Sequence, residues 1–237
     1  TTLGVESIGL YSPIIMWASM ITGFILPSFS TYLYPRFCEI KSNKEISSLL
    51  NDGIRLGTFV LIPLLFIGIP YKNFFISLFY TDEFLGASIY LPYHFLGVVF
   101  YVWWYVFSQS MTPTGRIKQH GIFLIIYFAL DMVVTYFFVK EIGLYGWMLK
   151  HIVSPFVFFW VYLIYAKKNM GLIMDRANSI LMIYLLLSAT ILISVDLFLV
   201  NLTFINYILG PVLLVLVMVF LKKDEKAFLR KKINFKI

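Results

Sequence analysis

The sequence predicts an all-α, polytopic membrane protein of about seven transmembrane helices. Of its 237 residues, 60% are hydrophobic and 13% are charged, and the mean hydropathy is +0.87. Soluble domains contain about 45–50% apolar and about 25% charged residues, so this chain has too few polar groups to cover a water-exposed surface. Aromatic residues make up 19% of the chain, which excludes a disordered protein.

Seven segments are apolar and long enough to cross about 30 Å of hydrocarbon, which takes about 20 helical residues. They are 8–33, 54–71, 86–108, 120–139, 143–165, 179–200 and 203–221. We expect residues 1–177 to form a bundle of five helices, 178–221 the last two helices, and 222–237 a basic cytoplasmic tail. Two segments, 39–52 and 222–237, mix apolar with charged residues and predict amphipathic helices at the membrane surface.

Lysine and arginine concentrate on one side of this predicted topology. Sixteen of the nineteen lie at Arg55, in the tail, or in the segments 34–53, 109–119 and 166–178. Lys72 and Lys140 lie on the opposite side. Since cytoplasmic loops are rich in these residues, we expect this segment's N-terminus outside and its C-terminus in the cytoplasm. The net charge of +7 is therefore interpreted as an excess of basic residues on the cytoplasmic side, and not as a sign of a nucleic-acid partner.

Four charged residues lie inside the predicted spans. Arg55 near an inner end and Asp196 near an outer end are expected to reach water. Asp131 and Lys150 lie roughly 10–12 Å deep on consecutive antiparallel helices, at a rise of about 1.5 Å per residue. An ion pair between them is therefore expected. A charge at this depth costs about 2.5–3.5 kcal/mol, which makes both residues functional candidates. The alternative, that the pair only fixes helix packing, stays open.

Polar side chains accompany these charges at helical spacing, in three stripes. The stripes are Tyr90, His94, Gly97, Tyr101, Tyr105 and Ser108; Tyr127, Asp131 and Thr135; and Gly146, Lys150 and Ser154. Because the stripes reach one depth, we predict a substrate cavity or coupling site formed by Lys150, Asp131, His94, Tyr90, Tyr101 and Tyr127. Hydrogen bonding between helices is the alternative for His94, and His151 is interpreted as a packing or lipid-facing residue.

Signals for an enzyme are nearly absent from the sequence. It contains no H-E-x-x-H, no G-x-S-x-G and no phosphate-binding loop, and the predicted loops are short. Its one cysteine, Cys38, allows no internal disulfide and no thiolate metal site. We therefore predict a protein that is not an enzyme and that needs no metal or cofactor. The start at Thr1, without a methionine or a basic leader, suggests a partial chain.

Several local motifs resemble one known family. They are residues 4–12 leading into the first span, 26–30 near its inner end, 78–84 (LFYTDEF), 114–118 (TGRIK) and 142–147 (IGLYGW). In order and spacing they resemble the C-terminal half of the Wzx-type O-antigen and polysaccharide flippases. These belong to the multidrug/oligosaccharidyl-lipid/polysaccharide exporter superfamily. The resemblance covers nearly the whole chain.

This resemblance implies the C-terminal lobe of a two-lobed exporter with fourteen helices. It implies translocation of an undecaprenyl-diphosphate-linked oligosaccharide across a bacterial inner membrane, for surface polysaccharide or O-antigen synthesis. Implied partners are membrane lipids, a missing N-terminal lobe and a polysaccharide polymerase. Arg116 and Lys118 would be basic residues on the cytoplasmic side. A cation-coupled multidrug exporter, a membrane polymerase or acyltransferase, and a non-transporting scaffold are the alternatives.

Overall fold

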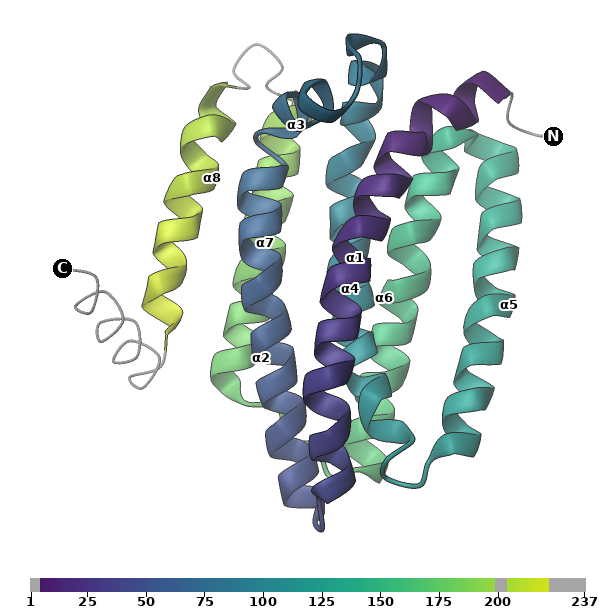
Figure 1. Ribbon diagram of the computed structural model, residues 1–237, viewed down its shortest axis with the longest axis vertical. Helices are drawn as coiled ribbons and strands as arrows, with labels where there is room; N and C mark the ends of the chain where they lie inside the picture. Colours follow the sequence, from purple (N-terminus) through teal and green to yellow (C-terminus); the bar gives the residue numbers. More distant parts are fainter. Residues whose placement is uncertain (1–4, 199–203, 222–237) are drawn as a thin grey trace.

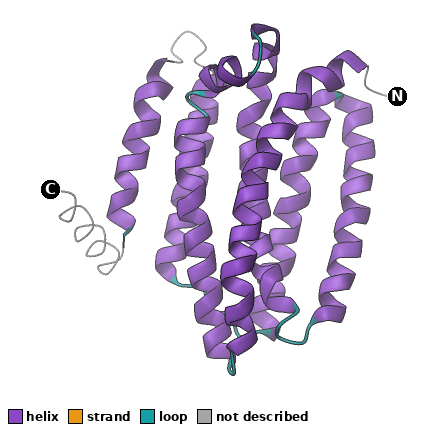
Figure 2. Ribbon diagram, in the orientation of Figure 1, coloured by secondary structure: helices purple, strands orange, loops and turns teal. Residues whose placement is uncertain are grey.

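The computed structural model describes residues 5–198 and 204–221, and within them every regular element is a helix (Figures 1 and 2). The long helices stand side by side in an upright bundle, and the α1–α2, α4–α5 and α6–α7 connections lie at one end of it (Figure 1). In chain order the elements are α1 (Val5–Glu39), α2 (Asn43–Gly68), α3 (Lys72–Phe79), the 3₁₀ segment η1 (Asp82–Tyr90), α4 (Leu91–Met111), α5 (Ile117–Ile142), α6 (Leu144–Asn169), α7 (Arg176–Phe198), α8 (Phe204–Leu216) and the 3₁₀ turn η3 (Val217–Phe220).

The all-α membrane fold is confirmed, but the described residues contain six helices of spanning length, not seven. The predicted span 203–221 is instead the shorter helix α8 followed by the turn η3. Two backbone carbonyls of this segment bind side chains from other helices: Tyr184 donates to Leu213 O at 2.7 Å, and Arg55 donates to Phe220 O at 2.8 Å. The regular helix ends between these two contacts. Residues 199–203 and the predicted tail 222–237 lie outside the described part of the chain.

The predicted surface helix over 39–52 is not a separate element, because Glu39 ends α1 and residues 43–52 form the start of α2. Ser42 caps this helix: the Glu45 amide donates to Ser42 Oγ at 3.3 Å, and Glu45 Oε2 accepts from the Lys41 amide at 3.1 Å. This reciprocal arrangement resembles a capping box, except that the carboxylate accepts from Lys41, one residue before the N-cap. Ile46 and Leu50 then face the core, so the amphipathic pattern reflects burial inside the bundle.

Helix α4 lies at the centre and packs against α1, α2 and α6. The approach to α6 is very close, since a Cβ at Gly97 would lie 2.2 Å from the carbonyl oxygen of His151. In the same way α6 touches α5 at Gly146, where a Cβ would lie 2.0 Å from Phe138 O. Small residues of this kind let backbones approach inside a membrane, where packing is a main source of helix association.

Arg55 does not reach water as expected, because it is buried between α2, α7 and η3. Its guanidinium donates to Asn178 Oδ1 at 3.3 Å and to the Phe220 carbonyl, and it lies 5.0 Å from the ring centre of Phe59. The charge therefore ties the last helices to α2, against which both α7 and α8 pack. The division of the chain at residue 177 stays a prediction.

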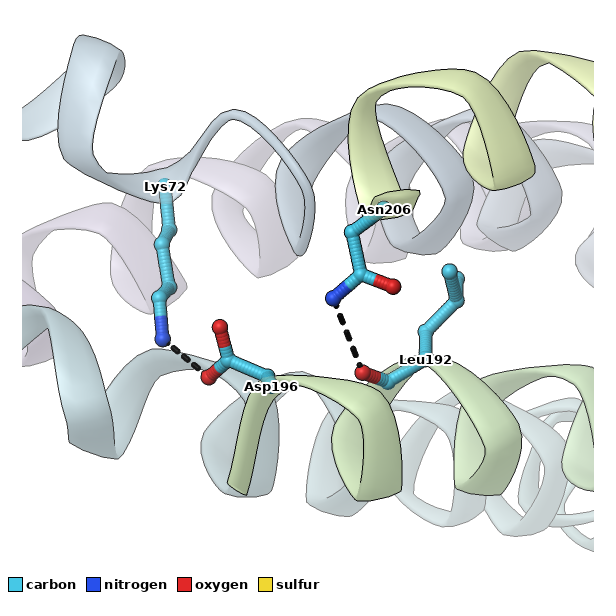
Figure 3. A network of polar contacts seen from close by, with 4 residues as sticks. All are labelled: Lys72, Leu192, Asp196 and Asn206. Atoms are coloured by element: carbon cyan, nitrogen blue, oxygen red, sulfur yellow. Dashed lines mark hydrogen bonds and ion pairs between the residues drawn. The ribbon is translucent and has the colours of Figure 1, made fainter. Parts of the chain in front are cut away.

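Asp196 also has a partner inside the protein (Figure 3). It accepts a hydrogen bond from Lys72 of α3, and the two side chains are only 12% and 10% exposed. Beside this pair, the Asn206 side chain of α8 donates to the Leu192 carbonyl of α7 at 3.1 Å. The ends of α3, α7 and α8 are thus joined by polar contacts, where the sequence analysis expected separate, water-exposed charges.

The close contact at Gly97 predicts the effect of a single added methyl group. Gly97→Ala should lower the free energy of unfolding by about 1–3 kcal/mol, because the new Cβ overlaps a backbone atom that cannot move alone. Gly121→Ala on α5 is the matched control, since nothing lies within 4 Å of its Cβ position. Thermal unfolding in detergent compares the two variants, and equal transitions would contradict the tight α4–α6 contact.

Candidate functional site

The expected ion pair between α5 and α6 is present. Lys150 Nζ donates to Asp131 Oδ2 at 2.9 Å, and the side chains are 12% and 22% exposed. The two helices can lie antiparallel because the chain reverses at Gly143, whose φ of +60° favours glycine. Lys150 Nζ also lies 5.1 Å from the ring centre of Trp147, one turn earlier on α6. The ammonium group is therefore held by a carboxylate and an aromatic face.

Lys150 lines a cavity of about 280 Å³ between α1, α4, α5 and α6, which we call the lysine cavity. The other aromatic residues with a polar group that line it are His94, Tyr101, Tyr127, Trp147 and His151. On the α1 side its wall is built from small or aliphatic residues, namely Ile15, Ala18, Ser19 and Thr22. From the predicted stripes, this cavity is lined by His94, Gly97 and Tyr101 of α4, Tyr127 of α5 and Lys150 of α6.

A second cavity of about 440 Å³ lies between α4 and α5, and we call it the aromatic cavity. Its lining is Tyr101, Trp104, Tyr105, Ser108, Gln109, His120, Leu124, Tyr127, Phe128 and Asp131. Tyr101 and Tyr127 belong to both cavities. Since Asp131 lines the aromatic cavity and Lys150 the lysine cavity, the ion pair stands at the boundary between them.

The two histidines of the lysine cavity lie against each other, with ring centres 4.6 Å apart. His94 Nδ1 lies 3.0 Å from the hydroxyl of Tyr11, so His94 does bridge two helices as the alternative interpretation held. His151, interpreted as a packing or lipid-facing residue, packs against His94 and against Trp147, whose ring centre is 5.8 Å away, and it also lines the cavity. Its Nε2 is buried and has no hydrogen-bond partner among the described residues.

Three predicted site residues lie apart from the cavities. Tyr90 packs against Tyr11 and Tyr145, with ring centres 6.0 and 5.4 Å away, and lines neither cavity. Arg116 donates to the carbonyls of Thr114 and Asn169 at 3.1 and 2.9 Å, so it braces the α4–α5 turn against the end of α6. Lys118 is exposed near the start of α5.

The sequence analysis missed Trp104, Gln109 and His120 as cavity residues. Gln109 directly follows Ser108, and Trp104 directly precedes Tyr105, both members of the predicted α4 stripe. A stripe widened to neighbouring positions would have included them. His120 opens a predicted span and gave no signal of its own. It becomes informative only in the fold, where its Nδ1 lies 2.9 Å from the Tyr162 hydroxyl.

The ion pair predicts a coupling between two variants. Asp131→Asn and Lys150→Met should each destabilise the protein, because each leaves a partly buried charge without its partner. The double variant should recover part of the loss, giving a coupling energy of about 1–3 kcal/mol in a double-mutant cycle of unfolding free energies. Lys140→Met, at an exposed end of α5, is the control. Strictly additive effects would show that the contact does not stabilise the bundle.

Comparisons with known proteins agree with this architecture. Residues 1–89 match a family model described as "Polysaccharide biosynthesis protein". The chain is 23% identical over 164 residues to the probable lipid II flippase MurJ of Borreliella burgdorferi, an alignment that covers 65% of this chain and 32% of that protein. The chain thus spans about a third of the length of this curated relative. No solved structure matches it at a comparable level.

The chain, whose described residues contain six long apolar helices, is thus similar to a polysaccharide biosynthesis family over residues 1–89 and to a probable lipid II flippase over 164 residues. Together these similarities support the family that the motifs resemble, the polysaccharide and lipid-linked-saccharide flippases of the multidrug/oligosaccharidyl-lipid/polysaccharide exporter superfamily.

Proposed function

We propose that this chain is part of a flippase that carries an undecaprenyl-diphosphate-linked oligosaccharide across the bacterial inner membrane, for surface polysaccharide or O-antigen synthesis. The observation that carries the proposal is a lysine ammonium beside a polar cavity within the helix bundle, held there by Asp131 at 2.9 Å. The similarity to a protein named as a probable lipid II flippase supports the same class of cargo.

The physical problem of such a protein is the charge of the diphosphate. A charged group at mid-membrane costs several kcal/mol unless a protein group of opposite charge lies beside it. Lys150 can supply this charge and donate hydrogen bonds to phosphate oxygens. In the absence of cargo Asp131 neutralises the ammonium, so the empty site does not leave a lone cation in a dry environment.

The other cavity residues supply neutral polar contacts. The hydroxyls of Tyr101 and Tyr127 border both cavities, and His94 and His151 add ring nitrogens on the Lys150 side. These groups can bind a head group without adding further fixed charge. In this proposal the site works together with a further lobe that closes the cavity on its open side and moves relative to it.

Within this proposal the basic end of the bundle is cytoplasmic. At that end of Figure 1, the α1–α2 connection contains Lys41, the α4–α5 connection contains Arg116, and Arg176 directly follows the α6–α7 connection. At the opposite end, Lys140 lies just before the α5–α6 connection. The asymmetry supports an N-terminus of this segment on the outer side. Translocation would then run from the basic side to the opposite one, with a polysaccharide polymerase as a partner there.

The role of Lys150 can be tested in cells that produce the intact protein. Lys150→Ala should abolish or strongly reduce surface polysaccharide, because the anionic head group loses its cation within the membrane. Lys150→Arg should retain much of the activity, and Lys140→Ala, at the exposed end of α5, should be neutral. Surface polysaccharide is measured on gels, with protein levels checked by immunoblot. Normal polysaccharide in Lys150→Ala would contradict the proposal.

The orientation can be tested through Cys38, the single cysteine of the chain, which is exposed near the end of α1. A membrane-impermeant maleimide should label it only after the inner membrane is opened. The matched control is Glu83→Cys in a Cys38→Ser background, because Glu83 is exposed at the opposite end of the bundle. Labelling of Cys38 and protection of position 83 in intact spheroplasts would reverse the assigned orientation.

A further inference from the structure

We propose that the aromatic cavity is a saccharide subsite, which binds a sugar ring of the cargo next to the diphosphate. This inference rests on the proposed function and goes beyond it, because it assigns a second cavity to a second part of the substrate. The cavity volume of about 440 Å³ falls within the range of roughly 300–1,000 Å³ that is typical of small-molecule sites.

The walls of the cavity fit the amphipathic surface of a sugar. Tyr101, Tyr105 and Tyr127 are half-buried and line it with aromatic rings. A pyranose presents C–H groups on its ring faces, which pack well on aromatic rings, and hydroxyl groups at its edge. Tyrosine suits such a ligand because each ring carries a polar hydroxyl beside its apolar face.

One polar group in this wall lacks a partner. The indole Nε1 of Trp104 is buried and has no hydrogen-bond acceptor among the described residues, and the whole side chain is only 4% exposed. A buried donor without an acceptor costs roughly 1–3 kcal/mol. The indole itself is held in place, since it stacks on Tyr162 with ring centres 5.5 Å apart. A sugar oxygen that reached this donor from the cavity would satisfy it, whereas a lipid acyl chain offers no acceptor.

Further hydrogen-bonding groups line the same space. Gln109 offers both a donor and an acceptor, and Asp131 uses one carboxylate oxygen for Lys150, which leaves its other oxygen to accept. The Nδ1 of His120 contacts Tyr162, so its Nε2 remains for a ligand. An aromatic wall combined with an amide, a carboxylate and an indole N–H fits neutral hydroxyl-bearing rings better than it fits a second phosphate.

The position of the cavity matches the chemistry of the cargo. In a glycosyl diphosphate the first sugar is bonded directly to a phosphate oxygen, so the two groups must bind side by side. The lysine and aromatic cavities share Tyr101 and Tyr127, and the Lys150–Asp131 contact of 2.9 Å joins their walls. A diphosphate near Lys150 would therefore place its first sugar at the aromatic cavity.

Two probes separate this inference from the proposed function: undecaprenyl diphosphate, and the same lipid bearing one N-acetylglucosamine. Binding of each to the purified protein in nanodiscs is measured by tryptophan fluorescence. We expect the sugar-bearing lipid to bind more tightly than the bare lipid. Trp104→Phe, which keeps the ring and removes the N–H, should weaken only the sugar-bearing lipid, by about 3- to 10-fold for one lost hydrogen bond.

Matched variants keep the test independent of folding. Tyr105→Phe removes a hydroxyl from a residue that lines only the aromatic cavity and should also weaken only the sugar-bearing lipid, whereas Tyr136→Phe alters an exposed residue of α5 and should change nothing. Trp160→Phe, on the exposed face of α6, is the control for Trp104→Phe.

The outcomes distinguish the two proposals. Equal binding of both lipids, with no effect of Trp104→Phe or Tyr105→Phe, overturns the saccharide subsite and leaves the flippase proposal standing. Equal weakening of both lipids by these variants also overturns it, because the cavity would then hold the diphosphate or the lipid chain. Failure of both lipids to bind the unmodified protein overturns the proposed function itself.

Discussion

Charges inside a membrane need partners within the protein, and this constraint organises the structure. Lys150 pairs with Asp131, Lys72 with Asp196, and Arg55 with the Phe220 carbonyl. Each contact joins two different helical elements: α6 with α5, α3 with α7, and α2 with η3. Because water cannot replace a lost partner at these depths, the contacts fix which helices are neighbours and how they are rotated.

The contacts differ in what surrounds them, and this difference separates structural from functional charges. Arg55 is enclosed by an amide, a carbonyl and an aromatic ring, so its capacity to bind other groups is used by the protein. The Lys150–Asp131 pair instead borders two cavities with polar and aromatic walls. A charge pair beside open polar space is suited to exchange partners, and this places the proposed site between α4, α5 and α6.

The central position of α4 explains why one helix serves both cavities. Its glycine at position 97 lets the His151 backbone approach closely, and this narrow contact brings the polar face of α6 toward that of α4. Helix α5 touches mainly α6, so one side of the aromatic cavity is walled by α5 residues, including Tyr127 and Asp131, and not by the packed core. Tight packing on one side of α4 and a looser contact on the other create the space for a ligand.

The fold class, the first six spanning helices and the Asp131–Lys150 pair could all be predicted from the amino-acid sequence. Hydropathy and length suffice to predict the helices because each must cross a bilayer of about the same thickness. The three-residue turn between the fourth and fifth predicted spans brings the two opposite charges close to each other at one depth. The packing of the helices was needed to show that residues 43–52 belong to α2, that Asp196 meets Lys72, that His151 lines a cavity and that the Trp104 N–H has no acceptor among the described residues. These features depend on how each helix is rotated and on which distant helix it meets. The local periodicity of the sequence gives neither the rotation of a helix nor the identity of its distant neighbour, because packing between helices far apart in the chain sets both.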